Sequence, residues 1–103
     1  MSTDNTKPTL TVAIAQAIIS QFKEKYFDSH VFIYMLRKNN LDVYNHYLSI
    51  NNNDYAAADG QIALVLAKNQ QQLNIEKIEI KLLSINILGN PSPNALWIKG
   101  DSK

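Results

Sequence analysis

The sequence predicts an α+β fold, in which N-terminal helices, three of them short to medium and one central, precede a C-terminal β-hairpin. Three observations predict it. Apolar residues recur at three- and four-residue spacing through most of the chain before Leu73, which is the period of an amphipathic helix. From Lys77 to Ile87 the period becomes two, as in a half-buried strand. The turn-forming run Gly89–Asn94 then separates this segment from a second short strand, Ala95–Lys99.

Length and composition are those of one globular domain. The chain has 103 residues, of which 46% are hydrophobic and 18% charged. We expect residues 9–99 to form that domain, with a disordered tail at 1–8 and a loose C-terminus at 100–103. The ten basic and nine acidic side chains nearly cancel, so the overall charge favours neither nucleic acid nor an acidic partner.

Several function classes are excluded by what the sequence lacks. It has no cysteine, which excludes disulfides, thiolate catalysis and thiolate metal sites. No apolar run approaches the ~18 residues of a membrane helix. The N-terminus carries no hydrophobic signal region. We therefore expect a cytoplasmic protein with no membrane partner.

The first half of the chain predicts three helices. The first, over Leu10–Tyr26, can be capped by Thr9 or Thr11, since a threonine oxygen accepts a free first-turn amide. Two short helices follow, over Asp28–Lys38 and Asp42–Ser49, and each begins at an aspartate that can cap it in the same way. The apolar stripe of the first helix comprises Ile14, Ala15, Ile18, Ile19, Phe22 and Tyr26.

The central helix is predicted over Asp54–Gln72, with Asp54 as its cap. Its middle, Ile62–Ala67, is apolar on every side, so we expect the fold or a partner to enclose it. Gly60 costs about 1 kcal/mol against alanine and predicts either a kink or a later helix start. The predicted inner face comprises Tyr55, Ala58, Ile62, Val65 and Leu66.

The hairpin is predicted from alternation. Apolar residues alternate with polar ones from Ile78, and the face changes at Leu82-Leu83, which indicates a bulge or bend. The two prolines of the Gly89–Asn94 run cannot donate to a ladder, so we expect a loop there. Trp97 lies on the strand face opposite Leu96 and Ile98. Two interpretations stay open for it, closure of the core or an exposed binding anchor.

This order of elements resembles the winged helix-turn-helix class, in which the helix before the hairpin enters the DNA groove and the hairpin tip touches the backbone. The resemblance covers about Thr11–Lys99 and rests on element order and length. It implies a recognition helix at Asp54–Gln72 and a wing tip at Gly89–Asn94. The chain departs from the class in charge, because Lys68 is the one basic residue of that helix and the tip has none.

We therefore expect a nonenzymatic binding module that docks DNA, or alternatively another protein, through the central helix and the hairpin. The protein alternative includes a homodimer or an adaptor. Arg37 and Lys38 add the only compact basic spot, which a solvated helix end also explains. The predicted contact residues are Gln61, Leu64, Lys68, Gln71, Arg37, Lys38, Asn90 and Trp97.

Nothing in the sequence predicts catalysis. His30 and His46 are the only histidines, and their separation has no ligand spacing. There is no HExxH motif, glycine-rich phosphate loop or nucleophile elbow. We expect no catalytic residue, metal, cofactor or small-molecule substrate. The aromatic side chains recur at helical spacing, which favours core positions over base stacking.

Overall fold

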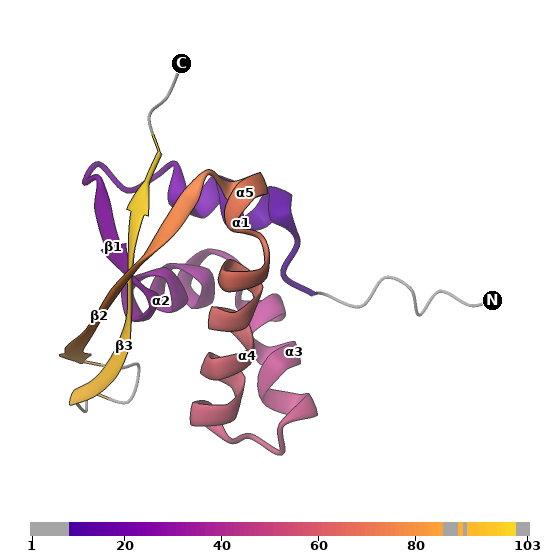
Figure 1. Ribbon diagram of the computed structural model, residues 1–103. Helices are drawn as coiled ribbons and strands as arrows, with labels where there is room; N and C mark the ends of the chain where they lie inside the picture. The colour runs from indigo at the N-terminus through magenta and orange to yellow at the C-terminus, as the bar shows by residue number, and fades with distance from the viewer. Residues whose placement is uncertain (1–8, 86–88, 90, 101–103) are drawn as a thin grey trace.

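The structure is a computed structural model that describes residues 9–85, 89 and 91–100. Within these residues the chain is α+β, with helices and a three-stranded antiparallel sheet (Figure 1). Residues 1–8, 86–88, 90 and 101–103 lie outside the described part. In chain order the elements are α1 (Val12–Ile19), β1 (Tyr26–Asp28), α2 (Ser29–Asn39), α3 (Leu41–Ile50), α4 (Tyr55–Lys68), α5 (Gln70–Leu73), β2 (Ile75–Ile85) and β3 (Pro91–Lys99).

The sheet has the order β1-β3-β2, so β3 is its middle strand. The predicted hairpin, β2 and β3, is confirmed, but β1 is an addition that the sequence analysis missed. Its residues were predicted to be helical or to join two helices. Tyr26–Asp28 instead pairs with Leu96–Ile98, about seventy positions further along the chain, and so satisfies its backbone groups in a ladder.

The first helix is shorter than predicted. Of the two predicted caps, Thr9 and Thr11, the structure uses Thr11. Its side chain accepts a 3.2 Å hydrogen bond from the Ile14 amide. It ends at Ile19 rather than Tyr26. The chain then turns so that the rings of Phe22 and Phe27 pack with centroids 5.1 Å apart. Packing with the sheet therefore overrides the helical periodicity of this segment.

Two of the three predicted aspartate caps are confirmed. Asp28 accepts a 2.8 Å hydrogen bond from the Val31 amide and begins α2. Asp54 accepts one of 3.2 Å from the Ala57 amide and begins α4. The prediction that Asp42 caps the third helix is wrong, because α3 begins at Leu41. One residue separates α2 from α3, so the aspartate falls inside the first turn.

The predicted central helix is two helices. α4 continues through Gly60, which therefore does not mark a later start. It ends at Lys68, where the side-chain amide of Asn69 donates a 2.8 Å hydrogen bond to the carbonyl oxygen of Val65. That bond satisfies one of the carbonyls that a helix end leaves without an intrahelical donor. The short α5 follows and covers most of the remainder predicted as helix.

Three residues of the predicted inner face of α4, Ala58, Ile62 and Leu66, are fully buried. Tyr55 and Val65 are partly buried and pack against the same core. Of the two alternatives predicted for the apolar middle of this helix, enclosure by the fold is wrong, because Leu64 is 50% exposed, and enclosure by a partner stays a prediction. Helices α2 and α3 cover one face of α4, and its opposite face is open.

Trp97 closes the core, at 1% exposure, and is therefore not an exposed anchor. Its partners across the sheet are Phe27 on β1 and Lys77 on β2. Because opposed residues in an antiparallel sheet share a face, this rung points toward the helices. Leu96 and Ile98 consequently lie on the other face of the sheet, where they are half-buried.

The hairpin differs from prediction near its tip. β3 begins at Pro91, so only part of the Gly89–Asn94 run lies outside a strand. Both prolines belong to a stretch of β3 that pairs with β2 and has no other described strand beside it. A sheet tolerates a missing amide donor in a stretch that has a neighbour on one side only. The irregularity in β2 lies between Ile78 and Lys81 rather than at Leu82-Leu83. Gly100, predicted to be loose, donates its amide to the carbonyl oxygen of Asn74 at 2.7 Å.

Candidate functional site

The open face of α4 carries a narrow stripe of exposed residues, which we call the outer stripe: Ala57, Gln61, Leu64 and Lys68. Their three- and four-residue spacing stacks them along one side of the helix. The stripe combines two small or apolar side chains, an amide and an ammonium group. It contains no carboxylate.

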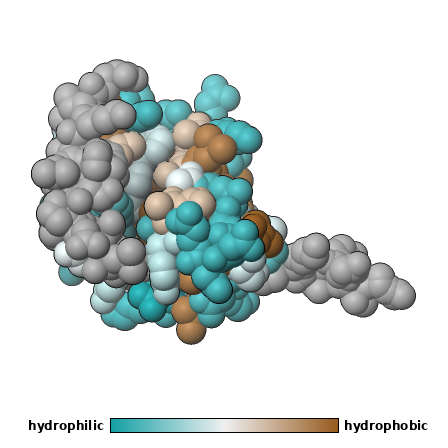
Figure 2. Space-filling view, turned by 90° about the horizontal axis from the view of Figure 1, so that it is seen from below, coloured by the Kyte–Doolittle hydropathy of each residue, from teal (hydrophilic) through white to brown (hydrophobic). Residues whose placement is uncertain are grey.

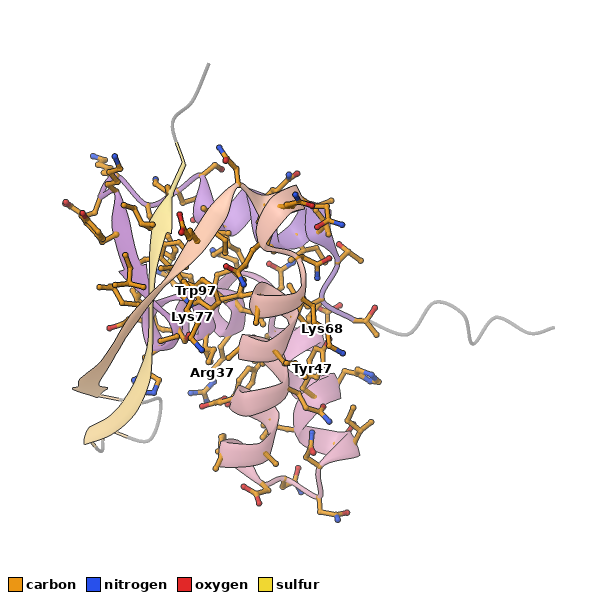
Figure 3. All side chains as sticks on the ribbon, viewed as in Figure 1. Arg37, Tyr47, Lys68, Lys77 and Trp97 are labelled. Atoms are coloured by element: carbon orange, nitrogen blue, oxygen red, sulfur yellow. The ribbon has the colours of Figure 1, made fainter. Side chains whose placement is uncertain are left out.

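Two cations lie beside α4 on the side that faces the hairpin (Figure 3). Arg37 is exposed in the last turn of α2. Lys77 is exposed on β2, and its pairing with Trp97 places it on the helix-facing side of the sheet. Figure 3 shows Lys68 on the other side of α4, nearer α3. Positive charge therefore flanks the helix on both sides.

These cations have no anionic partner within the described part of the chain. No carboxylate there pairs with Arg37, Lys68 or Lys77. Three of the described aspartates have other partners, because Asp28 and Asp54 cap helices and Asp59 accepts from a tyrosine. A protein with an almost neutral total charge thus presents, on and near one helix, three cations that no described carboxylate neutralises.

The three packed helices meet at Tyr44, which is fully buried. Its hydroxyl donates a 3.0 Å hydrogen bond to Oδ1 of Asp59 on α4. The Cζ atom of Arg37 on α2 lies 5.9 Å from the centroid of the Tyr44 ring, within cation–π range. Arg37 therefore contacts a ring that both α3 and α4 hold in place.

Burial governs the ionisation of this pair. It raises the pKa of Tyr44, and the negative charge of Asp59 raises it further. Burial also raises the pKa of the Asp59 carboxyl above its ordinary value, while the hydrogen bond from Tyr44 and the nearby charge of His30 oppose that rise. The hydroxyl consequently stays protonated and remains a donor to Asp59 at neutral pH.

The structure brings together some of the predicted contact residues and separates others. Gln61, Leu64 and Lys68 share the outer stripe, whereas Arg37 lies on the other side of α4, next to Tyr44 and Asp59 (Figure 3). Lys38 belongs instead to an exposed stripe of α2 that includes Val31 and Tyr34. The remaining three do not join the stripe: Gln71 lies on α5, Trp97 is buried, and Asn90 is outside the described residues.

Sequence reasoning missed Lys77 and the contact between Tyr44 and Asp59. Alternation alone placed Lys77 on the face opposite Ile78, which was taken as the inner face. Lys77 in fact lies on the helix-facing side of the sheet, because it pairs with the buried Trp97. That pairing joins residues twenty positions apart and cannot be seen in the local pattern. The fifteen-residue separation of Tyr44 and Asp59 likewise has meaning only once α3 and α4 are antiparallel neighbours.

One hollow on the described surface lies away from the outer stripe. It has a volume of about 550 Å³ and is lined mainly by α5 and the outer ends of β2 and β3. One of its cations, Lys99, is bound to the carbonyl oxygen of Phe22. His46 packs edge-on against Tyr47, with ring centroids 5.6 Å apart. Among the described residues, no three histidine, aspartate or glutamate side chains gather as metal ligands.

Comparison of the chain with protein-family models, curated proteins and solved structures found no match. None of the described helices is both long and apolar enough to span a bilayer.

Proposed function

We propose that this chain is a nonenzymatic, winged-helix-like DNA-binding module that places the outer stripe of α4 in the major groove. The order of elements supports this, since a helix followed by an antiparallel hairpin matches the arrangement in which helix and wing dock together. An α-helix with its side chains is about 10–12 Å across, which suits a major groove about 12 Å wide.

The side chains of the outer stripe fit contact with bases. Gln61 carries the paired donor and acceptor that match the N6 and N7 edge of adenine, and its Oε1, which accepts a 3.1 Å hydrogen bond from Asn51 Nδ2, must exchange that bond for the base. Ala57 and Leu64 supply apolar contacts for thymine methyl groups. The stripe itself has no carboxylate to repel the phosphates, and the nearest exposed one in sequence is the cap Asp54, three residues before Ala57 at the start of the helix.

The observation that carries the proposal is the set of cations on and near α4 that have no partner among the described carboxylates. Lys68 is on α4 itself, and Figure 3 shows Arg37 of α2 and Lys77 of β2 on the other side of that helix. No described carboxylate neutralises them. Positive groups in this arrangement provide the phosphate contacts from which nonspecific DNA affinity arises.

The test is a titration of fluorescent duplex DNA with the full chain at several salt concentrations. Nonspecific binding gives a Kd of about 10⁻⁴ to 10⁻⁶ M at physiological salt, and tighter binding below it. Three phosphate contacts give a slope of log affinity against log salt near −2.7, at about 0.9 per contact. Lys77→Gln should reduce the magnitude of that slope. Lys23→Gln, an equal charge change in the loop after α1, should leave the slope unchanged. No binding at about 100 μM protein in low salt contradicts the proposal.

A second candidate is docking of another protein, including a second copy, on the same face. The observation that favours it is Leu64, 50% exposed among small residues such as Ala57 and Gly60, which allow close approach of a partner helix. Figure 2 views the end where α3 meets α4 and shows a largely hydrophilic surface with separate apolar spots.

Sedimentation at several concentrations tests the homodimer, and a monomer throughout contradicts it.

A further inference from the structure

We propose that Arg37 is the fixed phosphate-binding group on the side of α4 that faces the hairpin, and that Tyr44 and Asp59 hold its guanidinium in place. This inference rests on the proposed function and names the chemical group that one of its cations takes, a phosphate of the nucleic acid backbone. Arg37 is distinguished from Lys68 and Lys77 by its contact with an aromatic ring.

The support for Arg37 comes from three helices at once. Its own helix is α2, the ring beneath it belongs to α3, and the hydroxyl of that ring is bound by Asp59 on α4. Tyr44 has no solvent exposure, and the ring of Tyr55 packs 6.5 Å from it. The platform under the guanidinium therefore does not reorient when a ligand arrives.

The contact with the ring also leaves the donors of Arg37 free. A guanidinium carries five N–H groups in one plane, and stacking on a ring does not consume them. Donation of the Tyr44 hydroxyl to Asp59 increases electron density in the ring, which strengthens its attraction for a cation. Arg37 remains exposed, and no described carboxylate pairs with it.

Phosphate is the ligand that this geometry favours. The planar donors of a guanidinium match two oxygens of a phosphate, and preorganisation lowers the entropy lost on binding. In the view of Figure 3, Lys77 lies on the same side of α4 as Arg37, which gives this side of the helix two cations. A polyanion satisfies both, whereas a single protein carboxylate satisfies one.

The test compares four proteins in the DNA titration: wild type, Arg37→Gln, Arg37→Lys and Lys38→Gln. Lys38→Gln is the matched control, because it makes the same charge change one residue away on another side of α2. We expect Arg37→Gln to lower the magnitude of the salt slope by about one and Lys38→Gln to leave it unchanged. Arg37→Lys should keep the slope yet weaken binding severalfold, since an ammonium lacks the planar fork. Equal behaviour of Arg37→Gln and Lys38→Gln overturns the inference.

The claim that Tyr44 and Asp59 position the guanidinium of Arg37 is tested by a separate measurement. We expect the Nε–Hε group of Arg37 in the free protein to show a high NMR order parameter, and Tyr44→Phe to lower it. Phenylalanine keeps the ring but loses the bond to Asp59. An Arg37 side chain as mobile in wild type as an unattached surface arginine overturns the positioning claim, whether or not the variant folds.

Inorganic phosphate distinguishes failure of the inference from failure of the proposed function. A shift of the Arg37 Nε–Hε resonance with phosphate, but not with chloride at equal ionic strength, supports the site even if DNA does not bind. DNA binding without any Arg37 response to phosphate or to the substitutions leaves the proposed function standing and overturns the inference. A response to neither ligand overturns both.

Discussion

The indole Nε1 of Trp97 donates a 2.9 Å hydrogen bond to the hydroxyl oxygen of Ser29, 68 positions earlier in the chain. Both side chains are buried, and Ser29 is the single polar residue among the buried ones described. The bond joins the middle strand of the sheet to the first residue of α2. It therefore fixes the position of the hairpin relative to the helices that support α4.

Removal of this bond should destabilise the fold. We expect Ser29→Ala to lower the free energy of unfolding by about 1–3 kcal/mol, because the buried indole N–H loses its partner. Ser49→Ala is the matched control, since Ser49 is exposed and bonds locally to the His46 carbonyl; it should change stability by less than about 0.5 kcal/mol. Urea unfolding measures both. Equal effects of the two substitutions would show that the Trp97 contact contributes no stability.

The start of α4 depends on Asp54. Asp54→Ala should cost about 0.5–2 kcal/mol, because the Ala57 amide loses its acceptor. Asp54→Asn should stay near the stability of wild type, since asparagine is an equally good cap. Thermal or urea unfolding distinguishes the two variants. A similar loss in both would assign the effect to charge rather than to the cap.

We expect the carboxyl of Asp59 to make the free energy of unfolding depend on pH. Burial raises its pKa above the unfolded value of 3.8, so the folded state holds the proton more tightly. This contribution is complete below the unfolded pKa and is lost as pH rises through the folded pKa. Relative to Asp59→Asn, which keeps an acceptor for Tyr44, the wild type should therefore lose stability as pH rises from 3.8 through the folded pKa of Asp59. A constant difference between the two unfolding free energies across that range would contradict it.

Leu64 and Tyr34 allow the α4 surface to be compared with another exposed apolar site. They are 50% and 55% exposed, on α4 and α2 respectively. Each substitution to glutamate should change stability by less than about 0.5 kcal/mol, because neither side chain is buried. Leu64→Glu should weaken DNA binding about tenfold or more by introducing a negative charge into the stripe, with a much smaller loss in Tyr34→Glu. Equal losses would assign the effect to net charge alone.

Local features of this fold were predictable, and non-local ones were not. Thr11, Asp28 and Asp54 bond to amides three residues away, so short sequence windows contain the whole interaction. The burial of Ile62 and Leu66 follows in the same way from helical spacing. These signals were sufficient to predict α2, α4 and the existence of the hairpin.

The errors arise where distant segments pair. Tyr26 extends an apolar helical pattern, but its backbone pairs with Ile98 in the sheet. Trp97 lies on the core face because Phe27 and Ser29 occupy that side, which alternation along β3 cannot reveal. The candidate site divides in the same way. The outer stripe follows from periodicity, whereas the position of Lys77 depends on strand register.

The most direct test of the account is an NMR titration of the ¹⁵N-labelled full chain with a short duplex at low salt. The account predicts the largest amide shifts along Ala57–Lys68 and at the Arg37 side chain, with little change around the hollow near Asn74. Shifts centred on the hollow, or no shifts at a large molar excess of duplex, would contradict it.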